Sequence, residues 1–148
     1  MASYYKSGYE SLLPPPSPEK MTVLFTRIFK KMENDWELSL QISEFGGKIL
    51  FILLNAERCL LFDLSENSPS VSISDENESA DVKIRLTLQD FHLYWCRKIE
   101  LLKAVTLRKI RVDGPFDKLM RLNELVSAGR KMYLNELANT GFNLQGEE

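Results

Sequence analysis

Apolar residues recur at regular spacings along the chain, and these spacings predict the order of its elements. From Pro18 onward, apolar side chains return every three or four positions, which predicts one amphipathic helix. Ser17 is a suitable N-cap and Pro18 a suitable first helical residue. The apolar stripe of this helix consists of Met21, Leu24, Phe25, Ile28, Phe29 and Met32.

The pattern of apolar residues after this helix predicts several strands. Residues 36–43 alternate between apolar and polar, and Gly46-Gly47 is expected to form a hairpin turn. Residues 49–54 are all apolar, which is typical of a strand that is covered on both faces or exposes one face to something other than protein. Further strands are predicted over residues 58–64, 71–73, 81–86 and 109–113, with most of 65–80 expected to be solvated loop.

Two short helices are expected between the last two strands. Thr87 precedes Asp90 by three residues, as in a capping box. The connection is long enough for the flanking strands to run parallel. After Gly114 a helical pattern continues to about Ala138, and Gly129 is expected to break or kink it. The predicted apolar faces of the two short helices are Leu88, Phe91, Tyr94 and Trp95 in the first and Leu101, Leu102 and Val105 in the second.

These elements predict an α+β fold, a mixed sheet of about five strands with helices gathered on one face. The expected organisation is one domain over residues 18–138, with tails at 1–17 and 139–148. A chain of 148 residues with 44% hydrophobic residues is long enough to bury a core.

Composition excludes several classes of function. The net charge of −2 gives no general argument for nucleic acid, and aromatic residues do not alternate with basic ones as in a single-strand binder. Cys59 and Cys96 each lie in an apolar run, so buried free thiols are expected. The first residues do not resemble a secretory signal, and no apolar run has the roughly 20 residues of a membrane span. A cytoplasmic protein is the simplest interpretation.

Candidate chemistry is sparse. The single histidine, His92, is expected to be a surface or hydrogen-bonded structural residue. No spacing of His and Cys predicts a metal site, and no motif predicts a cofactor. Basic residues cluster in the second half of the chain, as a solvated face or as a patch for anionic lipid headgroups or a partner protein.

The stretch from Ala80 to Gly114 resembles the central segment of the sterol carrier protein type 2 family. The resemblance rests on Ala80-Asp81, Asp90-Phe91, Arg97-Lys98, Ala104, Arg108-Lys109 and Gly114. The sequence departs from the family at Arg97 and Arg108, where the family has glycine, so the helix ends are expected to differ in shape. A bacterial subgroup that resembles quinone-biosynthesis accessory proteins also carries basic residues there.

The resemblance implies a non-enzymatic protein that binds and transfers a sterol, fatty acyl chain, phospholipid or isoprenoid between sheet and helices. The helix after Phe116 would be a movable lid, and Arg97 and Arg108 would orient the headgroup or dock the protein at a membrane or partner. The alternative is a scaffold or accessory subunit of a lipid or quinone biosynthesis assembly, with a filled core. The sequence does not indicate which lipid binds or the oligomeric state. The implied lipid-binding residues are Leu24, Ile28, Phe51, Leu53, Phe91, Tyr94, Trp95, Leu101, Leu102, Val105, Phe116, Leu119 and Met120.

Overall fold

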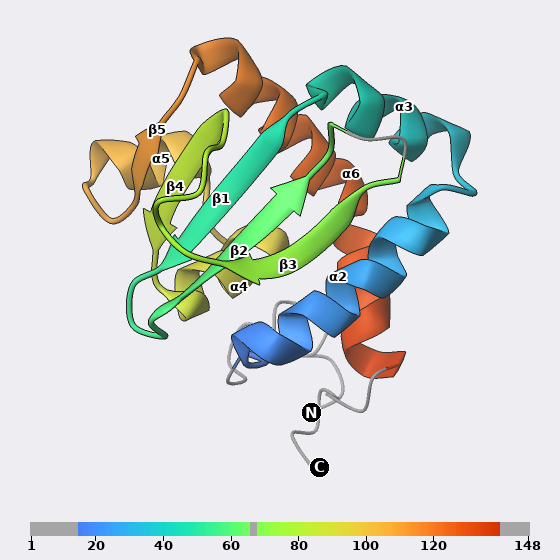
Figure 1. Cartoon of the computed structure of the whole chain (residues 1–148), viewed down its shortest axis with the longest axis horizontal. Helices are drawn as coiled ribbons and strands as arrows, with labels where there is room; N and C mark the ends of the chain where they lie inside the picture. The colour runs from blue at the N-terminus through green and yellow to red at the C-terminus, as the bar shows by residue number, and fades with distance from the viewer. Residues whose placement is uncertain (1–14, 66–67, 140–148) are drawn as a thin grey trace.

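The computed structural model describes residues 15–65 and 68–139, so most of the two predicted tails lies outside the described residues. Five strands form one sheet in the order β3-β2-β1-β4-β5, with the long helices behind it in Figure 1. Among the described residues no helix combines the length and apolar character needed to cross a membrane. The elements are α2 (Pro18–Met32), α3 (Trp36–Phe45), β1 (Lys48–Leu53), β2 (Arg58–Asp63), β3 (Ser70–Ser74), β4 (Val82–Leu86), α4 (Leu88–Trp95), α5 (Leu101–Thr106), β5 (Arg111–Asp113) and α6 (Phe116–Asn139).

The prediction of a strand over residues 36–43 is wrong, because this segment is helix α3. The side chain of Asp35 caps the helix by accepting a hydrogen bond from Leu38 N at 3.1 Å. The buried side chains Leu38, Ile42 and Phe45 are spaced by four and three, which is helical. The hairpin turn predicted at Gly46-Gly47 is also wrong, since Gly46 ends α3 in the left-handed conformation with φ of 59°.

The sheet contains both parallel and antiparallel pairs. Strand β1 pairs antiparallel with β2 and parallel with β4, through registers such as Phe51↔Leu60 and Phe51↔Ile84. Strand β5 pairs antiparallel with β4, through Ile84↔Val112, so the predicted parallel arrangement of these two strands is wrong. The length of their connection permits either direction, and it contains two helices rather than the single crossover helix of a βαβ unit.

The all-apolar strand β1 is central and covered on both faces. Ile49, Phe51 and Leu53 face the helices, and Leu50 and Ile52 belong to a second small cluster on the opposite face. That face has no helix, but the connection from β3 to β4 must cross β2 and β1 to join strands on either side of them (Figure 1). The Nζ of Lys83 donates to the carbonyl of Glu76 in this connection at 3.1 Å. The connection from β3 to β4 therefore covers the second apolar face.

Two glycines allow a tight corner around Asp81. The carboxylate of Asp81 accepts from Lys48 N at 2.8 Å, and Asp81 N donates to Lys48 O at 2.9 Å. A Cβ on Gly47 would lie 2.5 Å from Asp81 Oδ2, and one on Gly114 would lie 2.9 Å from Asp81 O. The corner joins the beginnings of β1 and β4 to the end of β5. Its packing is a structural reason for the presence of Ala80-Asp81 and Gly114 at these positions.

Helix α6 runs without interruption through Gly129, so the predicted break is wrong. Gly129 instead permits close packing: a Cβ there would lie 2.9 Å from Met32 Cε and 3.4 Å from Trp95 Cζ3. This contact brings α6 against α2, which packs on β3 and β2, and against α4.

Candidate functional site

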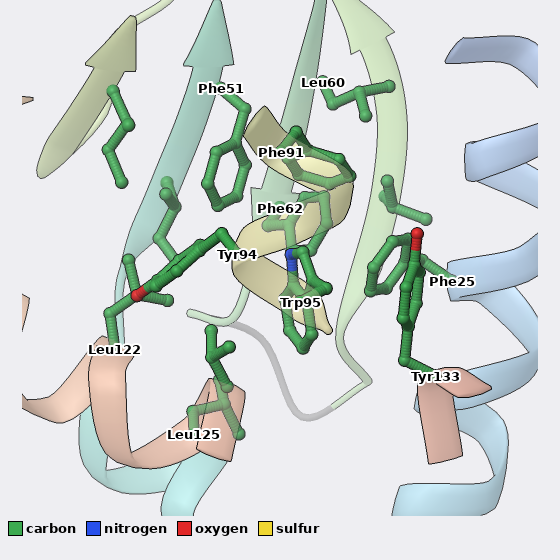
Figure 2. Close-up of a cluster of buried hydrophobic side chains, with 14 of the residues drawn as sticks. Phe25, Phe51, Leu60, Phe62, Phe91, Tyr94, Trp95, Leu122, Leu125 and Tyr133 are labelled. Carbon is green, nitrogen blue, oxygen red and sulfur yellow. The ribbon is translucent and has the colours of Figure 1, made fainter. Parts of the chain in front are cut away.

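Aromatic rings from five elements, α2, β1, β2, α4 and α6, occupy the space between the sheet and the helices (Figure 2). Phe25 of α2 is at the centre, with ring centroids 4.8 Å from Trp95, 4.9 Å from Phe62 and 5.5 Å from Tyr133. Phe51 of β1 lies 4.9 Å from Phe91. Most of these pairs are tilted or edge-to-face, the arrangements that favour aromatic attraction. We call the six rings, Phe25, Phe51, Phe62, Phe91, Trp95 and Tyr133, the aromatic cluster.

The structure brings most of the predicted lipid-binding residues to this interior. Their side chains are at most 2% exposed and belong to one continuous hydrophobic core. Leu119 lies at its margin with 9% exposure, and Val105 packs against it while partly buried. Their assignment to lipid stays a prediction. The buried members of the predicted set are Leu24, Ile28, Phe51, Leu53, Phe91, Tyr94, Trp95 and Leu101.

Three predicted residues lie outside the interior. Leu102, Phe116 and Met120 are 41%, 64% and 38% exposed. In α5 the buried positions are Leu101 and Ala104, so the helix turns Leu102 toward solvent. These three side chains do not line the space between sheet and helices in this conformation.

Trp95 carries a polar atom with no hydrogen-bond partner. Its side chain is 1% exposed, and its Nε1 is buried without an acceptor within the described residues. In Figure 2 the indole nitrogen points into the aromatic cluster. A buried N–H without a partner costs about 1–3 kcal/mol, so an acceptor brought to this point would be stabilised by it.

Gln41 Oε1 of α3 is also buried without a partner within the described residues, whereas the polar side chains beside the aromatic cluster are paired. His92 Nδ1 lies 2.7 Å from the hydroxyl of Tyr133, and the hydroxyl of Tyr94 donates to Asn123 Oδ1 at 2.7 Å. Burial raises the pKa of Tyr94 and of Tyr133 well above the ordinary value, so both hydroxyls stay protonated. His92 is a buried, hydrogen-bonded residue, in agreement with the structural role that the sequence favours. Cys96, also buried, lies 3.7 Å from His92 Nε2.

Arg97 and Arg108 lie at the ends of α4 and α5, in the left-handed conformation with φ of 60° and 63°. Both are exposed. The helix ends therefore keep the shape that glycine favours, and the expectation of a different shape is wrong. Their role toward a headgroup, membrane or partner stays a prediction.

The predicted set misses several members of the interior. Phe25, Phe62 and Tyr133 are buried in the aromatic cluster, and Leu122 and Leu125 of α6 lie beneath Tyr94 and Trp95 in Figure 2. Phe25 belongs to the same helical stripe as Leu24 and Ile28, and Phe62 to an alternating strand, so the periodicity contains the signal for both.

Comparison with known proteins identifies the family. The chain matches the SCP-2 sterol transfer family over residues 25–127, more than two thirds of its length, and it belongs to this family. No match was found among curated protein sequences.

Solved structures share the fold at low sequence identity. The sterol carrier protein domain 2 of Helicoverpa armigera superposes with a TM-score of 0.62 at 22% identity, covering 80% of this chain and 95% of that one. The UbiJ-SCP2 ubiquinone synthesis protein gives a TM-score of 0.61 at 13% identity, covering 80% and 98%. The apo form of sterol carrier protein 2 from Yarrowia lipolytica gives 0.57 at 16% identity, covering 74% and 92%. These structures agree with the predicted mixed sheet covered by helices.

Proposed function

We propose that the protein binds a hydrophobic lipid between the sheet and the helices and carries it without catalysing a reaction. Membership of the SCP-2 sterol transfer family supports this function. The observation that carries the proposal is Trp95 Nε1, a donor without a partner within an apolar interior. A lipid with an apolar tail and one acceptor oxygen would supply what this interior lacks, as do ligands in sites that are mostly apolar with few polar groups. Sterols, fatty acids and isoprenoid alcohols or quinones all have such an oxygen.

The rings that now occupy the interior must separate for a lipid to enter. Beyond Gly129, α6 is held by Tyr133, which contacts His92, and by Glu136, which forms an ion pair with Lys31. Before Gly129, its polar contacts include an exposed ion pair of 3.7 Å between Arg121 and Glu44, which contributes little, and two hydrogen bonds, from the hydroxyl of Tyr94 to Asn123 and from Lys118 to the carbonyl of Phe45. We place the movable part at the N-terminal half of α6, where Leu122 and Leu125 lie beneath Tyr94 and Trp95 in Figure 2.

Burial of the lipid tail would drive the opening. Each buried methylene contributes about 0.8 kcal/mol, so a long acyl tail contributes about 12 kcal/mol. Exposing Leu119, Leu122 and Leu125 would cost about 2 kcal/mol each. The gain exceeds this cost only for a long tail.

Native mass spectrometry of the purified protein tests the proposal. We expect a lipid adduct, or uptake of palmitate after delipidation. Trp95→Phe removes the N–H, so it should weaken palmitate binding about tenfold and leave binding of hexadecane, which has no acceptor, unreduced. A mass of the bare chain alone, with no uptake of palmitate, cholesterol or a prenyl alcohol, would contradict the proposal.

A scaffold in a lipid or quinone biosynthesis assembly is the second candidate. The packed aromatic cluster favours it, as does the exposed pair Trp36 and Leu40, which lie four residues apart on α3 with 78% and 42% exposure. The fold is also that of the UbiJ-SCP2 ubiquinone synthesis protein. If the protein takes up no lipid, and Trp36→Ser with Leu40→Ser abolishes co-purification of a partner, this second function is the better account.

A further inference from the structure

We propose that residues 97–111, which we call the basic segment, dock the protein onto a bilayer surface that contains anionic lipid. The segment has six basic residues and one acidic residue, Glu100, in a chain whose net charge is −2. All six basic side chains are exposed. Positive charge is therefore concentrated at the corner formed by α5 and its flanking turns, at the left of Figure 1. The basic residues are Arg97, Lys98, Lys103, Arg108, Lys109 and Arg111.

These charges are not neutralised by the protein. Across residues 15–65 and 68–139 the ion pairs use Lys31, Arg58, Arg85 and Arg121, and none uses a basic residue of the segment. Asp113, the acidic residue just beyond the segment, contacts Arg85 at 3.3 Å. The guanidinium and ammonium groups of the segment are thus available to lipid phosphates or carboxylates.

Exposed leucines lie among these charges. Leu102 and Leu107 are 41% and 60% exposed, whereas their neighbours Leu101 and Ala104 hold α5 to the core. Single exposed leucines are common on protein surfaces. Leucines flanked by long basic side chains, however, fit the interface of a bilayer, where the leucine enters the acyl boundary and the cations reach phosphates.

The backbone conformation in the turns of the basic segment is energetically unfavourable. In each of the two turns an arginine occupies the left-handed position at which glycine is more favourable. Strained positions concentrate at functional sites, which supports a role for the arginine side chains. The C-terminal ends of α4 and α5 also add partial negative charge here, which cations complement. Both effects are consistent with a role for the arginine side chains at this surface.

A bilayer fits better than an acidic protein, because Leu102 on α5 and Leu107 at its C-cap are exposed apolar side chains among the cations, which an acidic protein surface would not complement. Docking does not depend on where a lipid binds inside the protein. It would bring a lipid carrier to the surface where lipid is taken up or released.

Vesicle co-sedimentation tests the proposal, with phosphatidylcholine vesicles that contain or lack phosphatidylserine. We expect binding only with phosphatidylserine, and its loss at about 1 M salt, where the screening length falls to about 3 Å. Arg108→Gln, Lys109→Gln and Arg111→Gln combined should weaken binding on the order of 100-fold, since each cation near an anionic surface contributes about fivefold. The matched control removes three exposed charges from α2, with Lys20→Gln, Arg27→Gln and Lys30→Gln, and should change binding much less.

Contact of the leucines is tested by Leu107→Trp in a Trp36→Phe background, which leaves buried Trp95 as the other fluorophore. We expect a blue shift on phosphatidylserine vesicles and quenching by brominated acyl chains. Equal binding to both vesicle types, no binding to either, equal losses in the α2 control, or no fluorescence change at position 107 would overturn the proposal. Palmitate uptake by the Lys109→Gln, Arg111→Gln double variant, which keeps Arg108, should be unchanged while its vesicle binding weakens, which separates a failure of docking from a failure of interior lipid binding.

Discussion

Arg97 and Arg108 occupy the same position in two successive Schellman motifs. The N–H of Lys98 donates to Leu93 O at 2.8 Å, and the N–H of Lys109 donates to Ala104 O at 2.9 Å, each the long hydrogen bond of the motif. The arginine N–H groups complete the motifs with bonds of 3.0 Å to Tyr94 O and Val105 O. The C-terminal ends of α4 and α5 thus share the Schellman geometry, and both have an arginine at the left-handed position that favours glycine.

Replacing either arginine by glycine should stabilise the protein. A left-handed L-residue costs about 1 kcal/mol more than glycine, so Arg97→Gly and Arg108→Gly should each raise the free energy of unfolding by about that amount. Arg97→Ala and Arg108→Ala are the controls, since they remove the side chain and keep the strain. Urea denaturation measures the difference. Equal stability of the glycine and alanine variants would show that the left-handed conformation is not strained here.

The stability of the protein should depend strongly on the size of the side chain at position 129. Gly129→Ala gains about 1 kcal/mol of helix propensity, and the flexible end of Met32 can yield to the new methyl group, so its stability should stay within about 1 kcal/mol of wild type. Gly129→Leu would overlap Trp95 and should destabilise by about 2–3 kcal/mol. Thermal and urea unfolding of both variants measure this. A leucine variant as stable as the alanine variant would refute the close approach of α6 to α4.

The buried tyrosines should make the protein sensitive to alkali. Burial raises the folded-state pKa of Tyr94 and of Tyr133 above the ordinary value of 10.0. Their stabilisation is therefore complete below about pH 10 and is lost as the pH rises through the raised pKa, because only the unfolded chain ionises readily. Each should lower the free energy of unfolding by about 1.4 kcal/mol per pH unit in that range.

Tyr94→Phe and Tyr133→Phe should each remove one such contribution from the slope. Lysines titrate in the same range, but this background is common to all three proteins and cancels in the difference. Urea denaturation between neutral pH and about pH 11 provides the comparison. An unchanged slope in both variants would mean that these hydroxyls are not buried in the folded protein.

The length of the acyl chain should decide whether a ligand binds. Octanoate has about half the methylenes of palmitate, so its burial gains only about 5 kcal/mol, no more than the cost of uncovering the leucines of α6. Palmitate should therefore bind and octanoate should not, by isothermal titration calorimetry. Comparable affinity for the two would indicate a shallow site that needs no opening of α6.

Elements with one consistent pattern were predictable from the sequence. Helix α2 was predicted with its cap, and the side chain of Ser17 accepts from Lys20 N at 3.2 Å as expected. Helix α4 was predicted from Thr87, which accepts from Asp90 N at 3.1 Å. Strand β3 contains the short strand predicted at residues 71–73, where Val71 and Ile73 alternate with Ser72. In these segments, periodicity and local capping chemistry agree.

Helix α3 was mispredicted because its sequence satisfies two periods. Trp36 and Leu40 complete an alternating pattern with Leu38 and Ile42, yet only the latter two are buried. The helical spacing from Leu38 to Ile42 to Phe45, with Asp35 before it and Gly46 after it, was the overlooked signal. Alternation alone does not distinguish a strand from a helix with two exposed apolar residues.

The candidate site was predictable in its position but not in its detail. Apolar periodicity selects the interior face of each element, but it does not tell which of two adjacent leucines faces inward, and Leu102 proved exposed while Leu101 is buried. The unpaired Nε1 of Trp95 depends on how rings from distant segments pack. Such a feature is absent from any local pattern.

The most direct test of interior lipid binding uses the two tryptophans of the chain. Trp36→Phe leaves Trp95, which is 1% exposed, as the single fluorophore, and Trp95→Phe leaves Trp36, which is 78% exposed. Stearic acid that carries a nitroxide on its chain quenches only fluorophores that it closely approaches. If the lipid binds in the interior, we expect saturable quenching of Trp95 in the first variant and little quenching of Trp36 in the second. Quenching of Trp36 with Trp95 unaffected would place the lipid on the surface and contradict interior lipid binding.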